Sequence, residues 1–124
     1  MLIIEENAIN LTRGDDAAIV CAATTADGAE YEMQAGDSVV LTVRQKPDAG
    51  SPALLQVRSA PGSARIVLRG ADTRGMAPGK YSADVQLDTH DGRHYTIWPR
   101  LSGMTRWTSY NMQNFILMPE VTIE

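Results

Sequence analysis

Turn-forming residues recur along this chain at intervals too short to leave room for three uninterrupted turns of helix. Gly, Pro, Asp and Asn favour the backbone conformations of tight turns, so clusters of them separate regular elements. Such clusters occur near residues 13–16, 26–28, 35–37, 47–52, 60–63, 75–79 and 91–92. Between them we predict strands at residues 9–12, 17–24, 38–45, 53–59, 64–69, 80–88, 94–98 and 115–123. The spacing therefore predicts an all-β chain of seven to eight short strands, which favours an antiparallel sandwich.

The clearest strand pattern covers residues 80–88. Apolar and polar side chains alternate there, with Tyr81, Ala83, Val85 and Leu87 on one face and Lys80, Ser82, Asp84 and Gln86 on the other. This period of two predicts a strand with one buried face and one solvated face. Asp91-Gly92 follows and tolerates positive φ, so the chain is expected to turn back into the strand at residues 94–98.

The corner before this strand carries a second signal. We predict a single helical turn at residues 72–77, with Asp72 as its cap. The order Asp72, Gly79, Tyr81 resembles the corner that precedes the penultimate strand of immunoglobulin-like domains, where a tyrosine hydroxyl bonds to the backbone upstream. A plain core position is the other interpretation of Tyr81.

Length and charge limit the classes of function. The 124 residues are expected to form a single domain, residues 1–124. The net charge of −4 and scattered basic residues argue against a nucleic-acid partner. No apolar run approaches about 20 residues, so no membrane helix is expected, and the apolar start lacks the basic residues and length of a signal peptide. Cys21, the single cysteine, is expected to act as a small hydrophobe.

Motifs for catalysis are weak throughout, so we expect a non-enzymatic protein without a cofactor or metal. His90, Asp91 and His94 are candidate metal ligands, but a turn at Asp91-Gly92 accounts for them more simply. The tripeptide beginning at Arg13 and ending at Asp15 matches the sequence that integrins recognise. A tight turn is the favoured interpretation there too, with Asp15 or Asp16 bonding to nearby amides.

The strongest candidate for function is the segment 100–113, which has no clear strand pattern. Long loops within compact domains are uncommon and are often functional. Four aromatic residues, Trp98, Trp107, Tyr110 and Phe115, lie in or beside it, and aromatic residues with arginine are typical of protein interfaces. The candidate interaction residues are Trp98, Arg100, Arg106, Trp107 and Tyr110. For Trp98 and Phe115, burial in the core is an equally good interpretation.

Several of these segments together resemble the immunoglobulin-like β-sandwich domains of bacteriophage tails and baseplates, in particular the N-terminal domain of baseplate upper proteins. The segments are residues 9–16, 36–44, 78–87, 91–92, 95–97 and 115–122. The resemblance implies a structural component of a virion or prophage-derived assembly, made in the bacterial cytoplasm. It also implies protein partners, either other virion proteins or further copies in a homo-oligomer. Residues 1–124 do not include the long C-terminal extension of that family, so the resemblance does not extend to attachment through a downstream stalk.

A carbohydrate-binding module is the alternative from another functional class. In that interpretation Trp98, Trp107 and Tyr110 would form a platform on which sugar rings stack.

Overall fold

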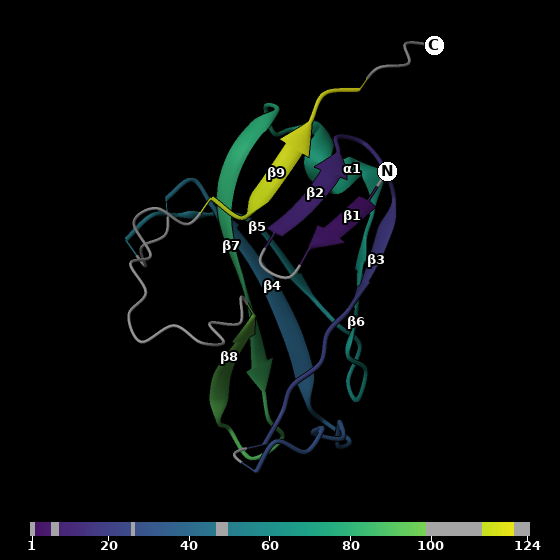
Figure 1. The fold of residues 1–124 in the computed structure, drawn as a ribbon, viewed down its shortest axis with the longest axis vertical. Coiled ribbons are helices and arrows are strands. Elements are labelled where there is room, and N and C mark those ends of the chain that lie inside the picture. Colours follow the sequence, from purple (N-terminus) through teal and green to yellow (C-terminus); the bar gives the residue numbers. More distant parts are fainter. Residues whose placement is uncertain (1, 6–7, 26, 47–49, 99–112, 121–124) are drawn as a thin grey trace.

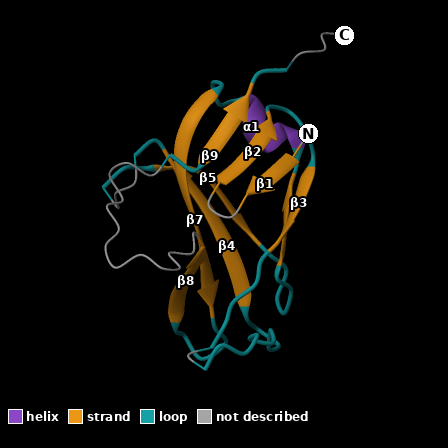
Figure 2. Ribbon diagram, in the orientation of Figure 1, coloured by secondary structure: helices purple, strands orange, loops and turns teal. Residues whose placement is uncertain are grey.

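Strands make up most of the regular structure of this protein (Figures 1 and 2). The computed structural model describes residues 2–5, 8–25, 27–46, 50–98 and 113–120. The strands in these ranges are β1 (Leu2–Glu5), β2 (Ala8–Thr12), β3 (Ala17–Val20), β4 (Ser38–Arg44), β5 (Ala53–Arg58), β6 (Arg65–Leu68), β7 (Gly79–Asp88), β8 (His94–Trp98) and β9 (Phe115–Met118). One short helix, α1 (Gly70–Arg74), lies between β6 and β7.

The strands form a mixed seven-stranded sheet and a separate two-stranded sheet. The large sheet has the order β1-β2-β9-β7-β4-β5, with β8 also paired to β7, and the small sheet pairs β3 with β6. Most neighbours are antiparallel, but β2 and β9 run parallel, with Ile9 opposite Phe115. The prediction of a mostly β fold is confirmed, whereas an all-antiparallel arrangement is wrong because β2 and β9 run in the same direction.

The core lies where the alternating faces of the central strands meet the small sheet. On β7, Tyr81, Ala83, Val85 and Leu87 are buried, and on β4, Val39, Leu41 and Val43 face them across the pair. Ile19 of β3 and the buried side chains of β6, Ile66 and Leu68, complete this core from the small sheet. Val85 is 2% exposed while Gln86 is only partly buried, which confirms the predicted register of this strand.

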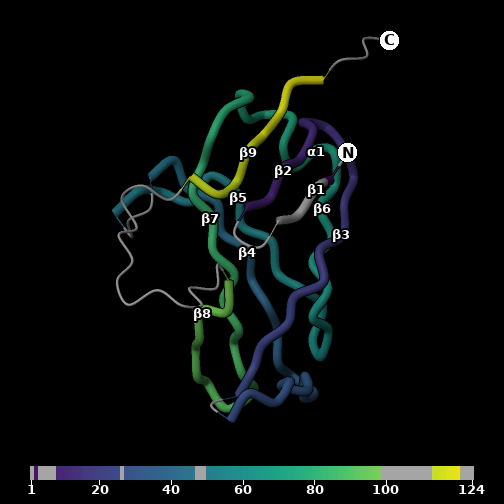
Figure 3. Tube along the Cα trace, viewed as in Figure 1, coloured from purple at the N-terminus to yellow at the C-terminus, as the bar shows by residue number. Residues whose placement is uncertain are grey.

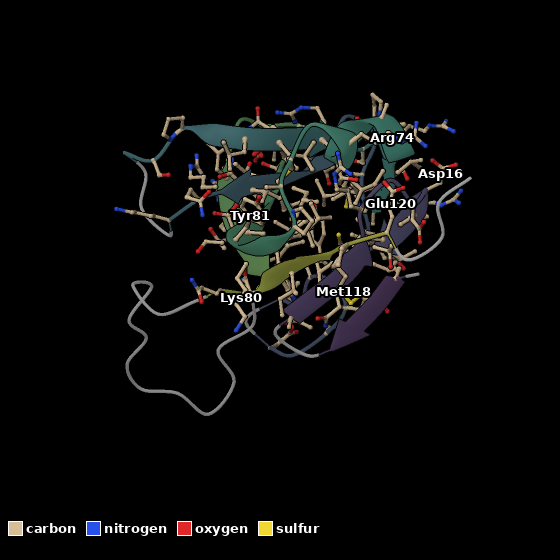
Figure 4. The ribbon with its side chains drawn as sticks, turned by 90° about the horizontal axis from the view of Figure 1, so that it is seen from above. Asp16, Arg74, Lys80, Tyr81, Met118 and Glu120 are labelled. Atoms are coloured by element: carbon tan, nitrogen blue, oxygen red, sulfur yellow. The ribbon has the colours of Figure 1, made fainter. Side chains whose placement is uncertain are left out.

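Helix α1 and Tyr81 form the corner that leads into β7. The Tyr81 hydroxyl donates a hydrogen bond to the carbonyl of Ala77, four residues upstream, and the ring itself is buried. Both interpretations of Tyr81 are therefore confirmed together (Figure 4). The helix starts two residues earlier than predicted, and Asp72 is within it, where its carboxylate accepts the N–H of Arg69.

The predicted strands differ from the structure mainly at their ends. β3 ends at Val20 and not at residue 24, and Thr24 instead pairs with Glu30 in an isolated antiparallel bridge. β9 ends at Met118 because Pro119, which lacks an N–H, follows it. Residues 121–123 of the same prediction lie outside the described residues. The pairing of β1 with β2 is an addition that the turn spacing did not predict.

Candidate functional site

The predicted interaction segment leaves the large sheet between β8 and β9. Both strands pair with β7: β8 lies opposite Val85 to Asp88, and β9 lies opposite Gly79 to Tyr81 (Figure 3). Residues 99–112 connect them and lie outside the described residues, and these include Arg100, Arg106, Trp107 and Tyr110. The two ends of the segment are therefore held on one strand of the sheet.

Asn114 fills the gap that the segment leaves along β7. Its side-chain oxygen accepts the N–H of Ala83 at 2.7 Å, and its side-chain nitrogen donates to the carbonyl of Ala83 at 2.9 Å. The backbone carbonyl of Asn114 meanwhile accepts the N–H of Ile9 at 2.7 Å. The residue is 2% exposed, so these bonds satisfy polar groups that water does not reach.

The geometry at Ala83 also shows which edge of β7 the segment occupies. Ala83 lies opposite Val43 of β4, yet both of its backbone polar groups bond to Asn114. In an antiparallel pair, a residue at a non-hydrogen-bonded position directs its N–H and carbonyl away from the residue opposite it, toward the other edge of its own strand. Asn114 and β9 therefore lie on the edge of β7 that β4 does not occupy, which is also the edge of β8. Strands β8 and β9 therefore pair one after the other along the same edge of β7, and residues 99–112 lie between them in the sequence. On its other side β9 pairs with β2.

Trp98, at the start of the insertion, is partly buried and packs against the core cluster. It lies opposite Val85, at a register shift between Val85 and Gln86. Phe115, on the other side of the insertion, is fully buried in the core. The core interpretation is thus confirmed for Phe115, and Trp98 is partly buried against the core.

A polar network that sequence patterns did not reveal covers the outer face of the large sheet near the β7–β8 turn. Asp88 accepts hydrogen bonds from Arg58 at 3.0 Å and from Gln86 at 2.6 Å, and its carboxylate contacts Nδ1 of His94 at 2.7 Å. Burial alone would raise the pKa of Asp88, but the contacts with Gln86, His94 and Arg58 outweigh it and lower that pKa. The same guanidinium donates to the Ser38 hydroxyl, so the network links β4, β5, β7 and β8.

His90, by contrast, bonds to a different carboxylate. Asp37 is fully buried and accepts the backbone N–H of His90 at 2.8 Å, the N–H of Gln34 at 2.9 Å and the Tyr31 hydroxyl. Nδ1 of His90 lies 3.0 Å from the same carboxylate. These donors, the Tyr31 hydroxyl above all, hold the pKa of Asp37 well below its usual range, and in return Asp37 raises the pKa of Tyr31 to about 12.

The proposed metal ligands therefore do not converge. His90 contacts Asp37, His94 contacts Asp88, and the Asp91 carboxylate accepts a bond from the Thr89 hydroxyl. Within the described ranges no three His, Cys, Asp or Glu side chains gather as a metal site would require. Gly92 has a φ of 87°, as the predicted turn requires.

The integrin-like tripeptide likewise forms part of the corner around α1. The Arg13 guanidinium donates to the carbonyls of Met76 and Arg74, and the N–H of Gly14 donates to the Thr73 hydroxyl at 2.9 Å. Asp16, which follows the tripeptide, accepts the N–H of Gly70 at 2.6 Å. In Figure 4, Asp16, Arg74 and Glu120 gather at this corner, and Glu120 lies 3.5 Å from Arg13. The turn interpretation is confirmed, and Arg13 is occupied by structural contacts.

Cys21 lines a hollow between the two sheets, below the end of β3. The hollow has a volume of about 380 Å³ and is also lined by Met33, Val39, Leu87 and Ile97. Burial raises the pKa of the Cys21 thiol to about 11, which keeps it protonated at neutral pH.

Comparisons with known proteins identify no relative: no family model, curated protein or solved structure matches this chain. Among the described residues, no helix has the length and apolar character needed to cross a membrane.

Proposed function

We propose that this chain is a non-enzymatic structural component of a phage or prophage-derived tail or baseplate assembly, and that it acts through protein–protein contacts. The segment 100–113 makes those contacts in this proposal. The observation that carries it is that residues 99–112 lie in the sequence between two strands, β8 and β9, that both pair with β7. A loop held in this way is presented by a rigid scaffold, which is where binding residues are concentrated in folded domains.

An immunoglobulin-like sandwich is the fold we propose for this scaffold. In that architecture the penultimate strand pairs with the third and the last strands of one sheet, while the second and fifth strands pair in the other. Here β7 pairs with β4, β8 and β9, and β3 pairs with β6. The bond from the Tyr81 hydroxyl to Ala77 adds the tyrosine corner of that architecture. The strands that would flank β3 and β6 in their sheet are replaced by β1 and β2, which lie beside β9.

Composition supports protein contact as the role of the segment. Arg106, Trp107 and Tyr110 belong to the residue types that are enriched at the centres of protein interfaces. The partner is then another virion protein or a second copy of the chain. A platform for sugars has less support, because Trp98, the one member within the described residues, packs against the core.

Replacing Trp107 and Tyr110 together by alanine tests the proposal. We expect sedimentation to shift toward monomer, or binding to a neighbouring tail protein to be lost, with little change in melting temperature. Tyr95→Ala is the matched control, because Tyr95 is an aromatic residue that is 47% exposed on β8, before the insertion. The control variant should associate normally, and tail or baseplate genes should flank the coding sequence.

Two results would contradict this assignment. Unfolding of the double variant would place Trp107 and Tyr110 in the core. Binding to a glycan array that Trp107→Ala removes would favour the carbohydrate-binding alternative.

A further inference from the structure

Within the residues that the structure describes, strand β3 has one paired edge and one free edge. Its pairing with β6 places Ile19 opposite Ile66, and the N–H of Cys21 continues the ladder by donating to the carbonyl of Ala64 at 2.9 Å. Polar groups alternate between the two edges of a strand, so those of Ala18, Val20 and Ala22 point away from β6. In the described part of the chain, β6 is the only strand that pairs with β3, which lies along the right-hand margin of Figure 1.

This free edge lacks the features by which proteins usually protect one. Residues 17–23 contain no charge and no proline, and Val20 is 76% exposed. Edge strands are normally shielded by charged residues, proline, bulges or a covering segment, because their unpaired backbone groups accept another strand. An uncharged, exposed edge such as this is a template for an added strand.

A hollow lies directly beside the same edge. The segment from Val20 to Ala23 forms one wall of the 380 Å³ space, and Val39, Leu87 and Ile97 of the large sheet form another. Side chains of an added strand alternate between its two faces, so every second one would point toward this space. Its volume lies within the range of about 300–1,000 Å³ that is usual for ligand-binding pockets. The backbone edge and the hollow are independent features that point to the same occupant.

The charges around the edge indicate what kind of strand fits. Glu30 and Glu32 also line the hollow, near the far end of β3, while Asp15 and Asp16 precede its first residue. Two copies of β3 paired antiparallel would bring Asp15 and Asp16 of each copy toward Glu30 and Glu32 of the other. This like-charge arrangement disfavours a second copy and favours a partner with basic residues.

We propose that the free edge of β3 binds an extended segment of a partner protein by strand addition. The segment inserts an apolar side chain into the hollow between the sheets and places a lysine or arginine beside Glu30 and Glu32. Main-chain hydrogen bonds to Ala18, Val20 and Ala22 provide affinity, and the hollow and the acids provide specificity. This surface lies along the small sheet and does not involve residues 99–112. The result of testing this inference therefore does not depend on the function proposed above.

Titration of the isotope-labelled protein with a synthetic peptide tests this inference. The peptide alternates valine with threonine and has a lysine at one end. In the free protein, the amides of Ala18 and Val20 should exchange with solvent faster than those of Ile19 and Cys21. Peptide at millimolar concentration should slow exchange at Ala18, Val20 and Ala22 and should protect Cys21 from alkylation.

Matched controls distinguish strand addition from nonspecific binding of the peptide. The same peptide with N-methyl groups on alternate amides cannot pair and should not bind. Val20→Lys should abolish protection, whereas Val67→Lys should preserve it, because Val67 is an exposed valine of the neighbouring strand β6. Replacing Glu30 and Glu32 by glutamine should weaken binding of the lysine peptide but not of a peptide with a neutral end.

Three outcomes would overturn the inference. The first is unchanged amide exchange at Val20 and Ala22 in the presence of millimolar peptide. The second is equal binding of the N-methylated peptide. The third is a dimer of the free protein that Val20→Lys dissociates, because a second copy would then occupy the edge.

Discussion

Among single residues, Asp37 joins segments that lie far apart in the sequence. Its buried carboxylate accepts bonds from Tyr31, Gln34 and His90, so it fixes the chain before β4 against the turn after β7. A carboxyl with a depressed pKa stabilises the folded state above its unfolded pKa of about 3.9, and this stabilisation is lost as the pH falls toward the folded value. Stability should therefore decline below about pH 4.

Asp37→Asn should lower the melting temperature at neutral pH and flatten this acid dependence. The amide keeps the size of the carboxylate but presents an NH₂ group to N–H donors. Urea unfolding at a series of pH values provides the measurement, with Tyr31→Phe as a second variant that keeps the charge and removes its principal donor. Tyr31→Phe should be less stable at neutral pH, and its acid-dependent loss of stability should be smaller and complete at a higher pH than in the native protein, because the pKa of Asp37 is then lowered less. Parallel pH profiles for all three proteins would contradict the role given to Asp37.

Gly70 is required by a close approach of two backbones. A Cβ atom at this position would lie 2.3 Å from the carbonyl oxygen of Gly14, which real Cβ atoms do not tolerate. Gly70→Ala should therefore lower the free energy of unfolding by roughly 1–3 kcal/mol, the usual effect of overpacking. Gly75→Ala is the matched control, since that Cβ meets nothing within 4 Å and the φ of −80° suits alanine. Equal urea midpoints for the two variants would show that the corner adjusts freely.

At the scale of elements, Asn114 completes the pairing of β7 between the stretches that pair with β8 and with β9. Asn114→Ala leaves the N–H and carbonyl of Ala83 without partners in a buried place, at a cost of roughly 1–3 kcal/mol for each group. We expect a clear fall in the urea midpoint and faster amide exchange at Ala83. Gln113→Ala, one residue earlier and exposed, should change neither. An unchanged exchange rate at Ala83 would mean that other groups complete the ladder.

Strand β7 provides a test of register. Val85→Asp should prevent folding, because an unpaired buried carboxylate costs several kcal/mol against a total stability of about 5–15 kcal/mol. Gln86→Lys should have a small effect, since Gln86 belongs to the outer face and contacts Asp88 and His94. Melting curves decide between them, and equal transitions would show that the side chains of β7 face the other way.

The contrast between predicted and missed elements follows from how local their signals are. The alternation from Tyr81 to Leu87 fixes the face of β7 from sequence alone. Leu2–Glu5 carries no such alternation, so β1 was missed. The contacts of Asn114 with Ala83, and of Asp37 with His90, join residues far apart in the chain, and no spacing rule reveals them. Of the candidate site, the structure places Trp98 beside the core, and the remaining residues stay a prediction.

At the scale of the whole molecule, both sheets share one core, because Ile19 and Ile66 of the small sheet pack in the same cluster as Leu41 and Val85. The protein should therefore unfold in one transition. In a Trp107→Phe background, fluorescence reports on Trp98, and its urea curve should coincide with far-ultraviolet circular dichroism. That spectrum should show β structure with little helix. A fluorescence change that precedes the dichroism change would indicate that the edge around Trp98 opens separately.

The parallel pairing of β2 with β9 has a consequence for the order of events during synthesis. Strands β4, β5, β7 and β8 pair with near neighbours and can form as soon as Trp98 has left the ribosome. Strand β2 must wait for Phe115 to Met118, which are translated long after it. Contacts between such distant segments slow folding because the intervening chain must first be closed into a loop. A nascent chain that ends before Phe115 thus holds β1 and β2 without their place in the sheet, exposed to chaperones and to other chains.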